Sequence, residues 1–353
     1  MSEHFLVTGA MGCIGAWVVR NLVREGTPRE NSRVVVFDLA TDPKRLKLLL
    51  DPDELGRVTF VAGDIANLAA LERALDENAI THVIHLAALQ IPFCRADPPL
   101  GARVNVVGTV NVFEAVKKRR AARINKVVYA SSVAVYDSAE AYPAGRPLAH
   151  DAHLHPNSLY GVYKQANEGT ARVYWEEDQV SSLGLRPYTV YGVGRDQGLT
   201  STPTKAMFAA AVGQPYRISY GGRNDFNYAD DVARAFIAAA RAPFEGADIF
   251  NLHGSAAHMR EVVAAIEAAA PEARGRITFE EKPLPFPDEV DGTPLARVIG
   301  SVPSTSLAEG VAWTIHRFRE LVAAGKMSRD EMLIGPTHVT AATTSEGGRD
   351  GLR

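Results

Sequence analysis

Short apolar runs alternate with longer amphipathic stretches through the first half of the chain. The apolar runs cover residues 5–7, 34–37, 58–61, 82–86, 126–130 and 182–185. Helical periodicity separates them at residues 14–25, 68–78, 100–120 and 158–177, and Gly26 is the expected C-terminal cap of the first of these helices. Strands that are apolar on both faces and alternate with helices are typical of a buried parallel sheet. We therefore expect residues 1–186 to form a doubly wound α/β domain.

The pattern changes after Arg186. Helices are expected over residues 204–212, 230–241, 260–270 and 306–324, with a short strand at 249–252 and a proline-rich irregular stretch around 283–294. This region, residues 187–330, is expected to be a smaller, mixed α/β lobe that covers the substrate and can interleave with the first domain. Residues 331–353 lack periodicity and are rich in Thr, Ser and Gly, so a flexible C-terminal tail is expected.

Composition and charge exclude several classes of protein. The chain has 353 residues, of which 46% are hydrophobic and 22% charged, so it is neither disordered nor fibrous. Its formal charge of −3 is too balanced to recruit nucleic acid or a membrane surface by bulk charge. Two cysteines cannot build a disulfide framework, and no apolar run reaches about 20 residues. A secretion signal is not expected, because the first residues lead directly into an apolar strand. A cytoplasmic location without a membrane partner is expected.

A glycine-rich loop, Thr8-Gly-Ala-Met-Gly-Cys-Ile-Gly15, joins the first strand to the first helix. Gly9 permits the tight turn, Gly12 lets the backbone approach a pyrophosphate, and Gly15 allows close packing of helix on strand. The helix N-terminus then offers amides to the phosphates. The loop is expected to bind a dinucleotide through Gly9, Met11, Gly12, Cys13, Ile14 and Gly15, as in a Rossmann fold.

Residues that end the next strands extend this expected cofactor site. Asp38 ends the second strand, where a carboxylate accepts hydrogen bonds from the adenosine ribose and repels a 2′-phosphate. No arginine follows it directly, so NAD is favoured over NADP; the alternative is that Asp38 only caps a turn. Later strand ends add a carboxylate near the adenine and small residues beside the cofactor, namely Asp64, Ile65, Leu86, Ala87 and Ala88.

A tyrosine and a lysine lie four residues apart, at Tyr160 and Lys164, and therefore on one face of a helix. A phenol has a pKa near about 10, which a nearby ammonium group lowers. Tyr160 could then take the proton of a substrate hydroxyl. Ser131 and Ser132 end the fifth strand, at the sheet edge where such folds bind ligands, and Ser132 is expected to hydrogen-bond the reacting oxygen.

Together these motifs resemble one family. The segments TGAMGCIG, GDI, HLAA, VNVVGTVNVFEA, VVYASSVAVY, YGVYK and LRPYTVYG, over residues 4–325, are similar to the extended short-chain dehydrogenase/reductases, which include nucleotide-sugar epimerases and dehydratases. The resemblance implies that Tyr160 is the acid/base, that Lys164 lowers its pKa and binds the nicotinamide ribose, and that Ser132 positions the substrate. It also implies that Asn105, Pro187 and Val190 lie near the cofactor. It further implies a homodimer in which helices 100–118 and 158–177 form a four-helix bundle.

Departures from the family pattern narrow the substrate. Val133 and Ala134 replace the acidic pair of the dehydratases. Thr189 replaces a common asparagine, and Arg223 lies one position before the usual diphosphate-binding arginine, which argues against a nucleotide-diphosphate sugar. Arg195, with Asp196 and Gln197 as its partners, could clamp a carboxylate or a hydroxyl; the alternative is a solvated loop with a local ion pair. The expected substrate contacts are Gln90, Ser132, Val133, Thr189, Arg195 and Arg223.

Three hypotheses of function follow. The first is an NAD-dependent dehydrogenase that oxidises a secondary alcohol of a small sugar, polyol or sugar acid. The second is a sugar epimerase that uses NAD transiently at the same residues. The third, a non-enzymatic binding protein, is disfavoured because Ser132, Tyr160 and Lys164 are all present. A zinc site at His150, His153 and His155 is not expected, nor is nucleic-acid binding by the basic run 117–120.

Overall fold

The structure is a computed structural model that describes residues 2–25, 32–119, 124 and 126–333. The expected helix cap Gly26, the last residue of the basic run, Arg120, and residues 334–353 of the expected tail lie outside the described residues.

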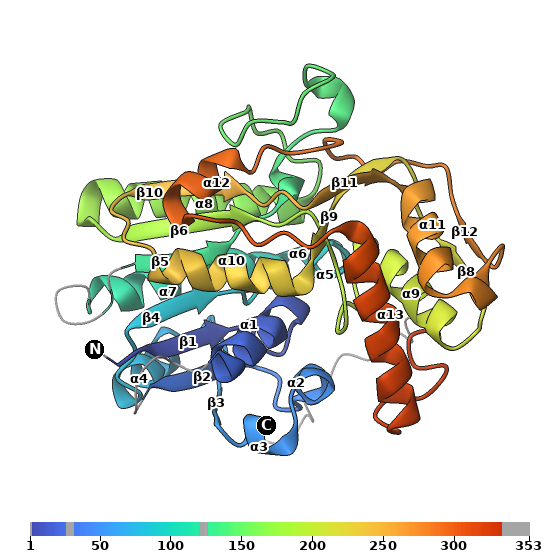
Figure 1. Ribbon diagram of the computed structural model, residues 1–353. Coiled ribbons are helices and arrows are strands. Elements are labelled where there is room, and N and C mark those ends of the chain that lie inside the picture. The colour runs from blue at the N-terminus through green and yellow to red at the C-terminus, as the bar shows by residue number, and fades with distance from the viewer. Residues whose placement is uncertain (1, 26–31, 120–123, 125, 334–353) are drawn as a thin grey trace, which may run out of the picture.

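A seven-stranded parallel sheet forms the centre of the molecule (Figure 1). Its strand order is β10-β6-β5-β4-β1-β2-β3. The strands are β1 (His4–Thr8), β2 (Arg33–Asp38), β3 (Val58–Ala62), β4 (His82–His85), β5 (Lys126–Ala130), β6 (Ser181–Arg186) and β10 (Ala247–Asn251). All registers in this sheet are parallel, for example Val7 opposite Val36 in β1 and β2. The predicted doubly wound Rossmann fold is confirmed.

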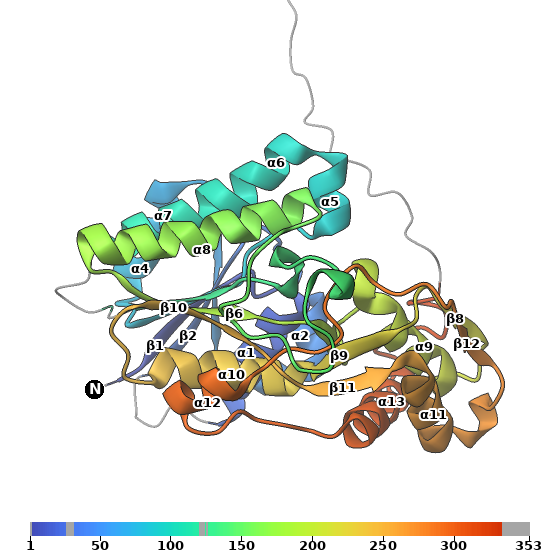
Figure 2. The ribbon, with the colours of Figure 1, turned by 90° about the horizontal axis from the view of Figure 1, so that it is seen from above.

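Helices cover both faces of this sheet (Figure 2). One face carries α1 (Cys13–Arg24), α10 (Ala229–Arg241) and α12 (Thr293–Ile299); the other carries α4 (Leu68–Glu77), α7 (Gly108–Lys117) and α8 (Leu159–Asp178). The helix expected over residues 100–120 starts at α6 (Pro98–Ala102) and passes through a π-helical turn, η1 (Arg103–Val107), before α7. Such turns are frequent at functional sites.

The second half builds a smaller mixed lobe at the carboxyl ends of the strands. It holds a three-stranded sheet, a two-stranded parallel sheet and the helices that pack on them. The elements are β7 (Thr189–Tyr191), β9 (Arg223–Tyr228), β11 (Ser255–His258), β8 (Tyr216–Ile218), β12 (Ile277–Phe279), α9 (Thr202–Ala211), α11 (Met259–Ala269) and α13 (Leu307–Ala323). These strands have three to six residues, too few for a clear hydrophobic period, and the sequence pattern did not predict them.

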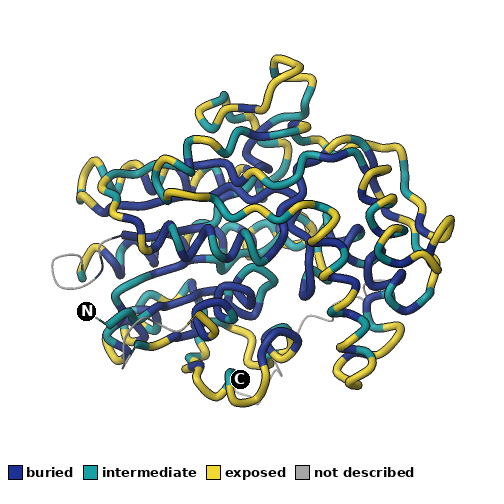
Figure 3. Tube along the Cα trace, in the orientation of Figure 1, coloured by how far each residue is buried: buried dark blue, intermediate teal, exposed yellow. Residues whose placement is uncertain are grey.

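Shorter elements connect the main ones. They are α2 (Lys44–Leu49), α3 (Pro52–Leu55), α5 (Ile91–Ala96), η2 (Val133–Val135), η3 (Ala139–Ala141), η4 (Leu199–Ser201) and η5 (Pro271–Ala273). Figure 3 shows that buried residues concentrate in the central layers, while exposed residues follow loops and outer helix faces.

The two units interleave, so residue 186 does not divide the chain cleanly. After β9 the chain returns to the main sheet through α10 and β10, and β10 pairs in parallel with β6. The alanine-rich side of α10 is buried against α1, which lets the two helices approach closely. Residues 229–251 therefore belong to the first unit by packing.

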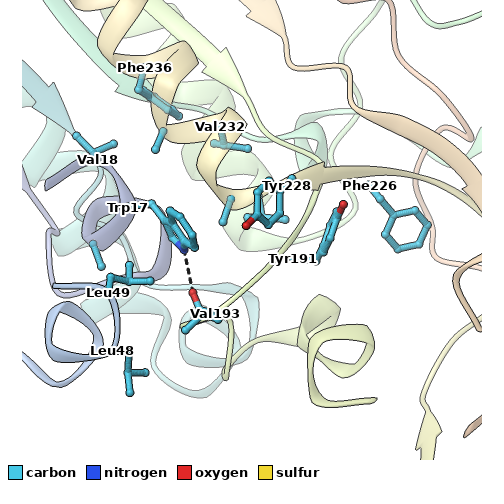
Figure 4. Packing of buried hydrophobic residues seen from close by; sticks show 14 of the residues in the cluster. Trp17, Val18, Leu48, Leu49, Tyr191, Val193, Phe226, Tyr228, Val232 and Phe236 are labelled. Carbon is cyan, nitrogen blue, oxygen red and sulfur yellow. Dashed lines mark hydrogen bonds between the residues drawn. The ribbon is translucent and has the colours of Figure 1, made fainter. Parts of the chain in front are cut away.

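Trp17 of α1 joins the two units (Figure 4). Its ring is 6% exposed and packs beside Tyr228, and its Nε1 donates a hydrogen bond to the carbonyl of Val193 at 2.9 Å. Leu48 and Leu49 of α2 are buried in the same hydrophobic cluster. The segment that leads into the substrate lobe is thereby fixed to the first unit.

Candidate active site

A pocket of about 470 Å³ lies between the two units, at the carboxyl ends of the central strands. Both units line it, as ligand sites of open α/β sheets require. Most of the residues expected to bind cofactor or substrate line this pocket: Gly9, Met11, Gly12, Cys13, Ile14, Gly15, Asp38, Asp64, Ile65, Leu86, Ala87, Ala88, Gln90, Ser131, Ser132, Val133, Tyr160, Lys164, Pro187, Thr189, Val190 and Arg195. Two expected residues, Asn105 and Arg223, do not.

The glycine-rich loop packs closely against neighbouring backbone, and its glycines carry no side chains that would fill the space of a phosphate. Gly9 has φ +67°, and a Cβ there would lie 2.5 Å from the amide nitrogen of Ala87. A Cβ on Gly15 would lie 2.4 Å from the carbonyl oxygen of Gly9. Gly12 caps α1 without a side-chain hydrogen bond, and the first turn of α1 has no acidic residue. The open helix N-terminus and the bare loop therefore fit a pyrophosphate.

Asp38 has a double role at the end of β2. Its Oδ2 accepts a hydrogen bond from Met11 N at 2.9 Å, and its Oδ1 accepts one from Ala40 N at 3.0 Å. It thus caps a turn and also ties the glycine loop to β2, with its carboxylate lining the pocket. Asp64 is held in a comparable way, because its Oδ1 accepts from Ala66 N at 2.9 Å.

Close packing brings Tyr160 to Ser132. Ser158 caps α8 by accepting a hydrogen bond from Gly161 N at 3.1 Å. A Cβ on Gly161 would lie 2.1 Å from the carbonyl oxygen of Ala134, so the start of α8 rests directly on the turn that follows Ser132. Only a glycine permits this contact, and it places both hydroxyls in one pocket.

Lys164 is buried one helical turn after Tyr160. Its Nζ donates to the carbonyl of Ala130 at 2.6 Å and lies 5.7 Å from the centroid of the Tyr160 ring. Burial lowers the pKa of Lys164 to about 8, while the nearby Cys94 and Glu168 raise it. Burial thus brings the pKa of the amine closer to neutral pH.

Burial raises the pKa of Tyr160, while a hydrogen bond with Ser132 and the positive charge of Arg195 lower it. Arg195 is therefore a cation that favours the phenolate, an effect that was expected from Lys164. The sequence gives no indication of this, because Arg195 lies 35 positions away and approaches Tyr160 only through the fold.

A buried polar network lies behind the pocket and was missed by the sequence pattern. Glu168 follows Lys164 by four residues and accepts a hydrogen bond from Ser131 Oγ at 2.5 Å. It forms a two-pronged ion pair with Arg186 at the end of β6, with N–O distances of 2.8 and 2.7 Å. Both side chains are nearly inaccessible, at 5% and 4% exposed. The four-residue spacing from Tyr160 through Lys164 was the available signal for Glu168.

Asn105 does not line the pocket but lies behind the residues that do. It lies fully buried in the π-helical turn, where its Oδ1 accepts from Leu89 N at 2.7 Å and its Nδ2 donates to Leu89 O at 2.9 Å. The side-chain amide of Asn105 thereby satisfies both backbone hydrogen-bonding groups of Leu89, in the loop after β4. Asn105 positions the pocket-lining residues of that loop.

Two residues that line the pocket, Arg195 and Gln90, carry buried polar atoms. Arg195 Nη2 donates to Thr200 Oγ1 at 2.8 Å, but its Nε and the Oε1 of Gln90 are buried without a hydrogen-bond partner among the described residues. Asp196, which was expected to act together with Arg195 on a ligand, forms an ion pair with Arg45 at 2.6 Å. Unpaired buried donors and acceptors favour a polar ligand.

Arg223 was expected to contact substrate, but it does not line this pocket. It begins β9 with a side chain that is 43% exposed and forms an ion pair with Glu289 at 3.0 Å, outside the pocket. Its neighbour Asn224 is buried and donates to the carbonyl of Gly221 at 3.2 Å.

One histidine of the histidine-rich loop before α8 contacts a carboxylate. His155 Nδ1 lies 2.8 Å from Asp137 Oδ2. Among residues 2–25, 32–119, 124 and 126–333, no three histidine, cysteine or acidic side chains gather as metal ligands would. None of the helices within those residues is long and apolar enough to cross a membrane.

Comparison with known proteins gives a consistent result. Residues 5–252 match the model of the NAD dependent epimerase/dehydratase family. The chain is 33% identical over 330 residues to a UDP-glucose 4-epimerase of Mycolicibacterium smegmatis, covering 89% of this chain and 98% of that protein.

Solved structures agree in fold. The UDP-glucose 4-epimerase of Thermus thermophilus in complex with NAD superposes with a TM-score of 0.74 and 27% identity, covering 90% of this chain and 99% of that one. MoeE5 in complex with UDP-glucose and NAD superposes with a TM-score of 0.74 and 28% identity, covering 91% and 100%.

The geometry at Asp38 predicts the cofactor preference. Replacing Asp38 by Ser should weaken NAD binding and lower the ratio of NAD to NADP affinity about tenfold or more, because charge-assisted hydrogen bonds and repulsion of a 2′-phosphate are lost together. Titration calorimetry with both cofactors measures this ratio. Asp42→Ser removes an exposed carboxylate from the same loop and should leave it unchanged. An unaltered ratio in the Asp38 variant would contradict the assignment.

Proposed function

Because this chain belongs to the NAD dependent epimerase/dehydratase family, we propose that it uses NAD to oxidise a secondary alcohol of a sugar, polyol or sugar acid, with Tyr160 as the acid/base. The observation that carries this proposal is the meeting of Ser132, Tyr160 and Lys164 in the same pocket as the glycine-rich loop. That arrangement supplies a proton acceptor next to a dinucleotide site.

NAD, when bound, supplies the acceptor for the hydride that leaves the carbinol carbon. Tyr160 takes the proton of the substrate hydroxyl at its phenol oxygen, so that a carbonyl is left on the substrate. Ser132 orients the reacting oxygen by a hydrogen bond. Arg195 favours the phenolate form of Tyr160 by its positive charge. We propose that Lys164, which is held by the carbonyl of Ala130 and lies 5.7 Å from the centroid of the Tyr160 ring, acts in the same direction.

The polar atoms at the far end of the pocket support a substrate with a carboxylate or several hydroxyl groups. Arg195 has an unpartnered Nε, and Gln90 has an unpartnered Oε1, among the described residues. Arg223 pairs with Glu289, and residue 224, where the family resemblance implies a diphosphate-binding arginine, is Asn224. This argues against a nucleotide-diphosphate substrate. We propose that Arg195 binds the most acidic group of the substrate.

Removing the phenol oxygen tests the acid/base assignment. Tyr160→Phe should lower turnover about 10²- to 10⁴-fold, because proton transfer from the hydroxyl loses its acceptor, while NAD affinity stays nearly unchanged. NADH absorbance and cofactor titration measure the two quantities. Tyr163→Phe is the matched control, since Tyr163 lies on the same helix and its hydroxyl donates to Pro98 O. Substantial residual turnover in Tyr160→Phe would overturn the proposal.

A second candidate function is a sugar epimerase that oxidises transiently and returns the hydride to the opposite face. The similarity to a UDP-glucose 4-epimerase over nearly its whole length favours it. The two reactions share every residue assigned above and differ in whether the cofactor leaves after each turnover.

The fate of the cofactor separates the two reactions. If the protein is a dehydrogenase, the purified protein should contain little NAD, and a screen of sugars and sugar acids should produce NADH in proportion to the substrate oxidised. Enzymatic assay of NAD and NADH released on denaturation, followed by that screen, makes the measurement. Near-stoichiometric bound NAD, with a stereoisomer formed and no NADH accumulating, would replace dehydrogenation by epimerisation.

We also propose that the protein is a homodimer. The outer faces of α6–η1 and α8 present exposed apolar side chains: Leu100, Val107, Leu159, Val162 and Val173. On α8 the exposed residues Leu159, Val162 and Val173 are spaced by three and eleven residues, which places them on one side of the helix and suits packing between two subunits.

The two unpaired cysteines, Cys13 and Cys94, support a reducing, cytoplasmic compartment for the protein.

The dimer proposal predicts the mass in solution. Size-exclusion chromatography with light scattering should give twice the mass of the chain, and Val162→Glu should give a monomer, because a charge would be buried in the apolar contact. Phe60→Glu, at an exposed aromatic residue outside these helices, should leave the dimer intact. A monomeric wild-type protein would refute the proposal.

A further inference from the structure

Arg45 of α2 forms a bridge that the sequence pattern did not indicate. Its Nη1 donates to the carbonyl of Met11 at 2.8 Å. Its Nε donates to the carbonyl of Gly194 at 3.1 Å, and its Nη2 lies 2.6 Å from Asp196 Oδ1. One guanidinium group thus connects three acceptors from two separate segments of the chain.

These segments are separate parts of the pocket lining. Met11 belongs to the glycine-rich loop, while Gly194 and Asp196 belong to the loop that enters the substrate lobe, and all three line the pocket together with Arg45. The bridge therefore joins the cofactor-binding wall to the substrate lobe at the pocket itself.

The bridge lies next to a fixed point of the same loop. The carbonyl of Val193 accepts a hydrogen bond from Trp17 in the buried cluster of Figure 4. The loop is therefore anchored at Val193, and the residues directly after it are held by Arg45. Gly194 has φ +90°, a conformation available to glycine, which lets the chain turn at this junction.

The bridge between Arg45 and Asp196 is more exposed to water than the buried ion pair between Arg186 and Glu168. The side chains of Arg45 and Asp196 are 20% and 31% exposed, whereas those of Arg186 and Glu168 are 4% and 5% exposed. Water can replace the partners of Arg45 at small cost, but it cannot reach those of Arg186. The Arg45 contact can therefore break and reform while the buried pair stays closed.

The loop held by Arg45 also carries Arg195. Arg195 follows Gly194 directly, lines the pocket, and lowers the pKa of the Tyr160 phenol. Holding the loop against the glycine-rich segment consequently sets the position of a cation that acts on the reacting group.

We propose that Arg45 is a positioning residue whose bridge from Met11 to Asp196 closes the pocket around a bound dinucleotide and limits its release. Opening of the bridge is the step that admits and discharges the cofactor. The inference depends on NAD binding and not on the sugar proposed above, so the two can fail separately. It also bears on the choice between cofactor exchange and retention.

The rate of cofactor release tests the bridge without any substrate. The wild-type protein is loaded with NADH, mixed rapidly with excess NAD, and followed by NADH fluorescence. Arg45→Met should raise the dissociation rate constant about tenfold, as expected for loss of a charge-assisted contact. Asp196→Asn removes the charge but leaves the contacts of Arg45 with the carbonyls of Met11 and Gly194, so it should raise the rate constant less, about fivefold. Because both changes act on one bridge, the double variant should release NADH no more than about twofold faster than the faster single variant.

Three further variants distinguish the bridge from a general loss of structure. Lys47→Met removes a cation from the same helix that pairs only weakly with Asp42, at 3.5 Å, and should leave release unchanged. Arg45→Lys keeps the charge but cannot reach all three acceptors, and should give an intermediate rate. Asp196→Asn does not alter α2, so it decides the question even if Arg45→Met fails to fold.

The outcomes that would overturn the proposal are specific. Release within twofold of the wild-type rate in Asp196→Asn would overturn it, as would independent, multiplying effects in the double variant. An equal acceleration by Lys47→Met would assign the effect to α2 as a whole. A lower melting temperature with unchanged release would make Arg45 a purely structural residue.

Discussion

The buried ion pair between Glu168 and Arg186 is the interaction on which the site depends. Two charges that are almost inaccessible to water must meet with good geometry, because an unpaired buried charge is costly. Glu168 therefore fixes the rotation of α8 against the end of β6. Since Tyr160 and Lys164 lie on the same helix, that constraint also sets where the phenol and the amine enter the pocket. Such a buried ion pair need not stabilise the fold more than an apolar contact would, but it requires one arrangement of α8 against β6.

Glycines complete this positioning where side chains would block it. At Gly161 the start of α8 touches the turn after Ser132, and at Gly9 and Gly15 the cofactor loop packs backbone against backbone. Close contacts of this kind leave the hydroxyls together and the helix N-terminus of α1 open. One side of the site is thus held by the buried ion pair and by close backbone packing. The other side, where the glycine-rich loop meets the substrate lobe, is bridged by the more exposed Arg45.

Much of the fold and site followed from local patterns. Buried parallel strands have continuous apolar runs, and the glycine loop and Asp38 occupy fixed places relative to the first two strands, so their positions could be predicted. Glu168 lay within reach of the same reasoning, since it continues the four-residue spacing from Tyr160. The position of Arg223 could not be predicted in this way, because its place in a family motif says nothing of Glu289, a residue from a distant segment with which its side chain pairs outside the pocket.

The sequence by itself determined the α/β class, the dinucleotide loop and the set of residues Ser132, Tyr160 and Lys164, because each depends on neighbours within one element or one strand-to-helix turn. Only the tertiary structure decided which charges pair. Asp196 binds Arg45 across 151 positions of the chain instead of its neighbour Arg195, and Arg195 is thereby left to act on Tyr160. The physical reason is that ion pairs depend on distance in space and on burial, and neither can be read from order along the chain.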